Sequence, residues 1–245
     1  MASGARSTVM VSDDLWERTS EHDVSESWGA VDLYWIPLGA GAHIVRVSGT
    51  AFEAVSALLQ RRGRCDLYHS ALVVHVPEGR FVIEQTPVPD LHGVRRGVVA
   101  EGSVGTSWAG GFRCFRYEIR CWRAGRIPDI DEAIASPVRL SDDLAMARRI
   151  LVLLPSVPTP VWGRDELGAG EMWNSNSVIS WVLARSGVDI AMVRPPRRGR
   201  APGWGAGRAV AARVIEREES SRRVAQVPTT STRWIGLGDT AELQC

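Results

Sequence analysis

The stretch that decides the fold is Tyr68-His69-Ser70-Ala71-Leu72-Val73-Val74-His75-Val76. Alternate residues of a β-strand point to opposite faces of its sheet, and both sets are largely apolar here. The pattern therefore predicts a central strand that is covered on both faces. The turn residues Pro77-Glu78-Gly79 follow, and Arg80 to Thr86 is predicted to return as the second strand of a hairpin.

More strands are predicted on both sides of this hairpin. Aromatic and branched residues from Val31 to Ile36 favour a strand, with His43 to Val47 as its expected antiparallel partner. Thr50 opens a predicted helix that Gly63 ends. Residues 97–104 and 112–122 supply further β structure around a Gly110-Gly111 break.

The second half of the chain is predicted to be helical. Ser141-Asp142-Asp143 caps a helix that runs to about Leu153, and a loop rich in Pro and Gly follows from 155 to 170. The last predicted helix covers about 174–186, with Gly187 as its stop. These elements define an α+β fold in which an antiparallel sheet packs against helices.

Composition divides the chain into three parts. Residues 1–27 are polar and are expected to be flexible, and 28–195 form the domain. The remaining part, 196–245, contains nine Arg against five acidic residues and is expected to be a flexible tail, with a short helix at 207–218 as an option. The formal net charge of the whole chain is only +1. Nucleic acid is therefore not an expected partner.

No apolar run resembles a signal peptide or reaches the ~20 residues of a membrane span. We therefore expect a cytoplasmic protein without a membrane span. The four Cys show no spacing typical of zinc ligands, so we expect no metal and no other cofactor. Cys114 and Cys121 are expected to be buried thiols, with a disulfide as the alternative.

Two segments could carry chemistry. Ser175 lies in the first turn of the helix predicted for 174–186, where unpaired backbone N–H groups and the helix dipole stabilise negative charge. Ile179 and Val182 follow at +4 and +7, so Ser175 is expected to face the sheet. His69, at the head of the central strand, is expected to lie opposite. A base and a nucleophile need this arrangement.

The segments that carry these residues, about 68–86 and 172–187, resemble circularly permuted papain-like hydrolases. The similar families are the desumoylating isopeptidases, the lecithin–retinol acyltransferases and permuted relatives of bacterial cell-wall amidases. In these families the strand with the catalytic His precedes the helix with the catalytic Cys. His69 matches the His, and Ser175 stands at the position of the Cys.

The resemblance implies a hydrolase or acyltransferase that acts on an amide, isopeptide or ester bond through an acyl-Ser175 intermediate. His69 would be the general base, and Glu84 would orient its imidazole. Asn174, Asn176 and Trp173 would contact the substrate, an unidentified peptide, lipid or small-molecule acyl compound. Ser in place of Cys replaces a readily ionised thiol by a hydroxyl that hardly ionises, so activation would depend on His69.

Each of these residues also has a purely structural interpretation. Asn174-Ser175-Asn176-Ser177 is typical of a helix cap, and Glu84 fits a solvent-facing hairpin position. The second hypothesis is accordingly a binding or scaffold protein that kept the cleft and lost the nucleophile. A third gives the Arg-rich tail the role of interaction surface.

Overall fold

The computed structural model describes residues 28–38, 65–88, 97–105, 111, 115–127 and 129–226 of the 245-residue chain. The strands are β1 (Ala30–Pro37), β2 (Tyr68–Val76), β3 (Gly79–Pro87), β4 (Val98–Ser103), β5 (Arg116–Arg123) and β6 (Val138–Ser141). The α-helices are α3 (Leu144–Leu153), α4 (Ser175–Ser186) and α5 (Trp204–Ala225), and short 3-10 turns cover Ile130–Glu132, Leu154–Ser156 and Pro196–Arg198.

The strands form one open antiparallel sheet in the order β4-β5-β3-β2-β1-β6. In the register of β1 and β2, Ser70 pairs with Trp35 and His69 pairs with Ile36. The predicted hairpin is present, since β2 pairs with β3 from Leu72 opposite Ile83 onward. The α+β class and the central position of β2 are therefore confirmed.

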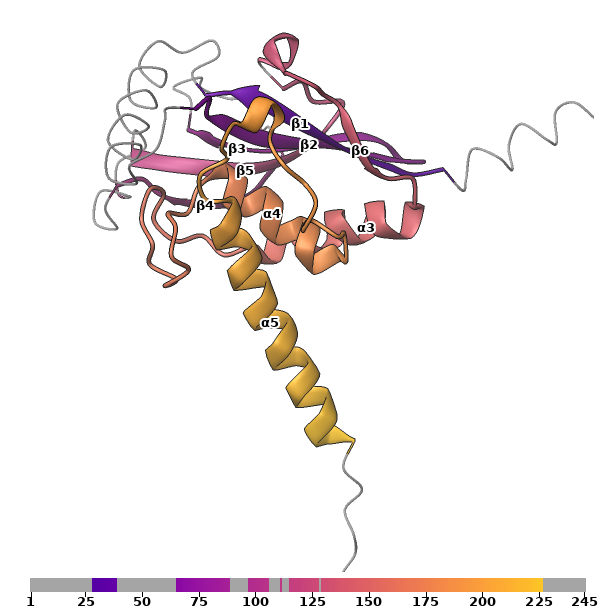
Figure 1. Ribbon diagram of the computed structural model, residues 1–245. Coiled ribbons are helices and arrows are strands. Elements are labelled where there is room, and N and C mark those ends of the chain that lie inside the picture. The colour runs from indigo at the N-terminus through magenta and orange to yellow at the C-terminus, as the bar shows by residue number, and fades with distance from the viewer. Residues whose placement is uncertain are drawn as a thin grey trace, which may run out of the picture.

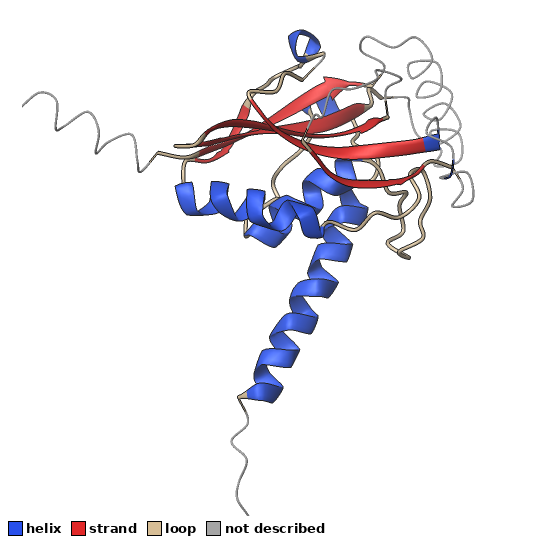
Figure 2. Cartoon of the chain, turned by 180° about the vertical axis from the view of Figure 1, so that it is seen from behind, coloured by secondary structure: helices blue, strands red, loops and turns tan. Residues whose placement is uncertain are grey.

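Each face of the sheet carries its own apolar cluster. Even-numbered residues of β2, such as Leu72 and Val74, pack into the large cluster that includes α3, α4 and α5. Odd-numbered residues, such as Ala71 and Val73, join a smaller cluster with Ile36, Val82 and Ile127. We call the two sides the helix face and the opposite face; Figure 2 shows the helices gathered beneath the sheet.

Helix α4 is the central helix of the domain. Ten of its twelve residues are buried, because the sheet, α3 and α5 surround it. The helix ends at Gly187, whose φ of 93° is left-handed and favours glycine. The prediction of this helix and of its stop is confirmed.

Close contact between two helices positions α5. The hydroxyl of Ser177 donates to the Gly203 carbonyl at 2.8 Å, and that of Ser180 donates to the Trp204 carbonyl at 2.9 Å. A Cβ on Gly207 would overlap the Ser177 carbonyl oxygen and the Ser180 hydroxyl, so only glycine fits at this crossing.

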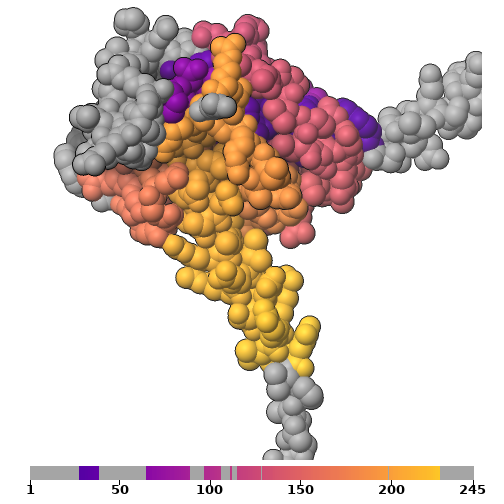
Figure 3. Space-filling model, viewed as in Figure 1, coloured from indigo at the N-terminus to yellow at the C-terminus, as the bar shows by residue number. Residues whose placement is uncertain are grey.

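Much of the segment from residue 196, which was expected to be a flexible tail, is helical, and α5 includes the range 207–218 that was the alternative there. Helix α5 has 22 residues, and its first half buries Trp204, Val210 and Ala211 on the body of the domain. Its second half leaves the body as a single rod (Figures 1 and 3). The domain therefore extends beyond residue 195.

The neighbours of β1 in the sheet differ from the expected one. The strand at 31–36 was expected to pair with 43–47, but β1 pairs with β2 and with β6. The segments 1–27, 43–47, 50–63 and 227–245 lie outside the described residues, as does Cys114. Among the helices that the structure describes, none is long and apolar enough to cross a membrane.

Candidate functional site

The first turn of α4 is built by a capping box. Asn174 Oδ1 accepts hydrogen bonds from the backbone N–H groups of Asn176 and Ser177, at 2.9 and 3.4 Å. In return, the Asn174 backbone N–H donates to the Ser177 hydroxyl at 3.1 Å. The Asn174 side-chain amide also donates to the Pro202 carbonyl at 2.9 Å. These bonds use Asn174 as the cap of α4, which is its structural interpretation.

Asn176 fixes this turn to β2 and to the start of α5. Its Oδ1 accepts a 2.8 Å hydrogen bond from Ser70, and its Nδ2 donates to the carbonyls of Tyr68 and Pro202, both at 2.9 Å. The residue is only 2% exposed. Both side-chain amides therefore form internal hydrogen bonds, which does not fit the expectation that Asn174 and Asn176 contact substrate.

Trp173, the third residue expected to contact substrate, is a core residue. It is 2% exposed and belongs to the apolar cluster of the helix face. Packing is the usual role of a Trp so deeply buried. The Trp173 side chain therefore does not line a solvent-accessible surface.

Ser175 is placed as expected with respect to its own helix. It is 6% exposed and begins the buried stripe that continues with Ile179 and Val182 beneath the sheet. Within the described part of the chain, no hydrogen bond engages its hydroxyl. The hydroxyl lies near the N-terminal end of α4, on the helix face.

His69 lies on the opposite face. Its register partner Ile36 and its strand neighbour Ala71 both belong to the smaller cluster, whereas the adjacent Ser70 reaches α4 through Asn176. The sheet itself therefore separates the His69 imidazole from the Ser175 hydroxyl. The structure does not bring the expected base and nucleophile together.

The electrostatic state of His69 also disfavours the role of base. Burial lowers the pKa of its imidazole to about 4, and no charged group contributes to the shift. A base must accept a proton in the transition state, and a buried imidazole without a nearby carboxylate gains no stabilisation for that positive charge. His69 is thus a half-buried neutral side chain at neutral pH.

Glu84 shares the opposite face with His69 but is bound elsewhere. Arg120 Nη1 lies 3.4 Å from Glu84 Oε1, and Arg120 also donates two hydrogen bonds to Glu118, at 2.8 and 2.9 Å. Glu84 and Arg120 are 8% and 2% exposed. Glu84 is thus neither a solvent-facing hairpin residue nor held by His69; it belongs to a buried ion-pair cluster between β3 and β5.

A second polar cluster on the opposite face was missed from the sequence. Asp32, which is 4% exposed, accepts hydrogen bonds from Arg139 at 2.6 and 3.3 Å and lies 3.4 Å from His75 Nε2. Burial is the main cause of a lowered His75 pKa, which Asp32 partly opposes. The cluster joins edge strand β6 to β1 and β2. The only sequence signal was an acid inside an otherwise apolar strand.

Cys121 lacks the properties of an alternative nucleophile. Burial raises the pKa of its thiol to about 11, and Cys65 is a half-buried residue ahead of β2. A nucleophilic cysteine requires the opposite shift. Nor do three or more His, Cys, Asp or Glu side chains of the described segments meet in a group that could hold a metal ion.

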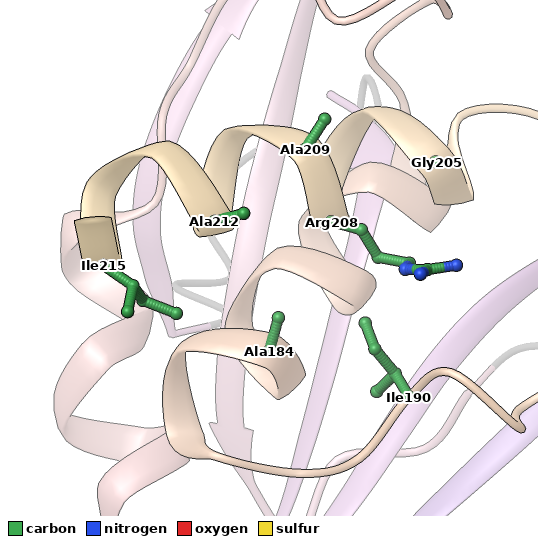
Figure 4. Close-up of a pocket in the computed structure, with 7 residues that line it drawn as sticks. All are labelled: Ala184, Ile190, Gly205, Arg208, Ala209, Ala212 and Ile215. Carbon is green, nitrogen blue, oxygen red and sulfur yellow. The ribbon is translucent and has the colours of Figure 1, made fainter. Parts of the chain in front are cut away.

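A groove lies between α4 and α5, away from the head of α4 (Figure 4). Its volume is about 370 Å³, and its lining is apolar apart from Arg208. We refer to it as the α4–α5 groove. No sequence pattern indicated it, because its lining residues come from a helix and from a segment that was expected to be a tail.

The fold and these sites define an α+β domain with an open six-stranded antiparallel sheet, whose helices cover one face. Comparison of the chain with protein-family models, with curated proteins and with solved structures found no match.

Proposed function

We propose that this protein is a catalytically inactive binding or scaffold protein of papain-like ancestry. The observation that supports this proposal best is the location of His69 and Ser175 on opposite faces of the sheet. Acyl transfer through a serine requires a base within hydrogen-bond reach of the hydroxyl. The resemblance of the two motifs to permuted papain-like hydrolases then concerns ancestry rather than chemistry.

The polar residues around Ser175 support the same proposal. Asn174 and Asn176, which could have contacted a substrate, form the cap of α4 and its connection to β2. A nucleophile also needs to be reached by its substrate, and Ser175 is 6% exposed. The helix dipole at the start of α4 favours a negative charge there, but it does not ionise a hydroxyl by itself.

The competing function is a hydrolase or acyltransferase that uses Ser175, and one labelling experiment separates the two. A fluorophosphonate probe and a smaller sulfonyl fluoride are incubated with the folded protein, and modified peptides are identified by mass spectrometry. We expect no modification of Ser175 beyond that of the heat-unfolded chain. Labelling of Ser175 that disappears in His69→Gln would overturn the proposal and support the enzyme.

A substituted thiol tests the site even if the probes fail to enter. In Ser175→Cys, alkylation of residue 175 by iodoacetamide is followed against pH, with site-resolved mass spectrometry to exclude the native thiols. We expect the same alkylation profile in Ser175→Cys and in Ser175→Cys combined with His69→Gln, because the imidazole lies across the sheet and the effect of the helix N-terminus on the thiol is common to both variants. A thiolate formed below pH ~7 that depends on His69 would contradict the proposal.

A further inference from the structure

The α4–α5 groove has an apolar floor and apolar sides. Ala184 of α4 and Ala209 and Ala212 of α5 contribute small apolar side chains to its lining, and we call these three residues the alanine floor. Ile190 and Ile215 line the two ends (Figure 4). A volume of about 370 Å³ lies within the range of pockets that take small ligands. The lining favours an aliphatic group.

Arg208 is the charged residue of this lining. Its side chain is exposed, and no residue within the described segments pairs with its guanidinium. Two neighbouring arginines are bound instead: Arg185 forms a two-point ion pair with Glu218, and Arg213 donates to the carbonyls of Leu167 and Gly168. An available guanidinium beside an aliphatic groove selects an anion attached to an apolar chain, and its planar donors match a carboxylate.

We infer that the α4–α5 groove binds an unbranched aliphatic monocarboxylate, with the alkyl chain along the alanine floor and the carboxylate on Arg208. This inference supplies a ligand for the proposed binding function and rests on it. It concerns a site remote from the head of α4, and the binding involves no covalent step. The apolar chain provides most of the affinity, and Arg208 provides the preference for the acid.

The first test compares ligands that differ only in the head group. Isothermal titration of the full chain with octanoate, 1-octanol and octylamine should give the tightest binding for octanoate, by about tenfold over the alcohol at low salt. From hexanoate to nonanoate, each added methylene should tighten binding up to about fourfold until the groove is full. Equal affinity for octanoate and octanol, or no dependence on chain length, would overturn the inference.

Variants then locate the site. Arg208→Gln should weaken octanoate about tenfold and leave 1-octanol unchanged, because it removes only the charge-assisted contact. Arg217→Gln, on the same helix but outside the groove, is the matched control and should change neither affinity. Ala212→Phe places a ring in the groove at an exposed helix position and should abolish binding of both ligands. Binding that survives Ala212→Phe places the ligand elsewhere and refutes the inference.

The two proposals can fail separately. Absence of octanoate binding with an unlabelled Ser175 would refute the groove ligand and leave the inactive-domain proposal intact. A labelled, His69-dependent Ser175 would refute the inactive domain, whatever binds in the groove. The thermal midpoint of each variant, measured without ligand, confirms that the groove substitutions leave the domain folded.

Discussion

The hydroxyl of Ser70 donates a 2.8 Å hydrogen bond to Oδ1 of Asn176 and so joins the middle of the sheet to the first turn of α4. This bond is buried, and Asn176 adds two further bonds to backbone carbonyls. Both residues lie in the two segments in which a base and a nucleophile were expected. The hydrogen bond between them shows that polar residues of these segments connect the sheet to α4.

Replacing Asn176 by Ala should therefore cost stability. The substitution leaves the Ser70 hydroxyl and a buried carbonyl without their partner, and each such loss costs about 1–3 kcal/mol. We expect the free energy of unfolding to fall by about 3 kcal/mol in urea denaturation. Asn174→Ala, which removes the N-cap two residues earlier, should cost only about 1 kcal/mol. A loss below about 0.5 kcal/mol for Asn176→Ala would be typical of a surface substitution, and it would refute the structural role of Asn176.

The charge cluster on β5 provides the second prediction. Arg120→Met would remove the buried cation that pairs with both Glu84 and Glu118, so we expect a loss of about 3–5 kcal/mol in the free energy of unfolding. Arg116→Met is the control on the same strand, because Arg116 pairs with Glu101 where both side chains are about 40% exposed. That substitution should cost less than about 1 kcal/mol. Similar losses for the two variants would contradict the role of burial.

His69 should make stability depend on pH. Its folded pKa, about 4, is lower than its ordinary value of 6.5, so below pH 6.5 the unfolded chain binds the proton first. Stability is therefore complete above pH 6.5 and falls as the pH drops toward 4. Between pH 7 and 5 this group should account for roughly 2 kcal/mol.

The measurement for His69 is the difference between two titrations. Urea unfolding of the native chain and of His69→Gln is compared at pH 7 and pH 5, so that all other groups, His75 included, cancel. The variant should lose roughly 2 kcal/mol less stability on acidification than the native chain. Parallel pH profiles for the two proteins would show that folding does not lower the pKa of His69.

At the crossing of α4 and α5, the usual effect of replacing a helical glycine by alanine should be reversed. Within a helix, Gly→Ala ordinarily stabilises by about 1 kcal/mol. Gly207→Ala should instead destabilise by more than about 2 kcal/mol, because its methyl group would overlap Ser177 and Ser180 of α4. Gly205→Ala is the control: its methyl group would meet only the end of the Glu171 side chain, which accepts a 2.7 Å hydrogen bond from the Gly203 N–H, so the loss should not exceed about 1 kcal/mol, the typical contribution of one such bond. Thermal unfolding of both variants tests the pair, and a stabilising Gly207→Ala would show that the helices cross farther apart.

The sequence predicted the strands β1 to β5 and the helices α3 and α4, but it could not predict which side of β2 the helices cover. Period-two alternation is clear in Tyr68–Val76, yet both sets of residues are apolar. Nothing in the strand alone decides which set meets α4. The choice depends on Ser70, whose hydroxyl needs a buried partner and finds it in Asn176. This choice directs His69 away from Ser175.

The full length of helix α5 was not predicted, for a different reason. The segment after residue 196 is rich in Arg and Gly, and such composition normally indicates a solvated chain. Only the first half of α5 carries an apolar stripe, and small residues such as Gly203 and Gly207 act there as close-contact positions rather than as helix breakers. Their role depends on the surface of α4, which the local sequence does not contain. The four-residue strand β6 escaped prediction similarly, since it is held by Arg139 through a distant Asp32.

The second half of α5 has a mechanical consequence. From Glu216 to Gln226 every residue is exposed, and the last connection to the body is the ion pair between Arg185 and Glu218. At 1.5 Å per residue, the seven residues from Glu219 to Ala225 carry the chain roughly 10 Å farther along the helix axis. Helix α5 therefore works as a spacer, and a label attached at Gln226 would lie at the end of this exposed arm, away from the body of the domain.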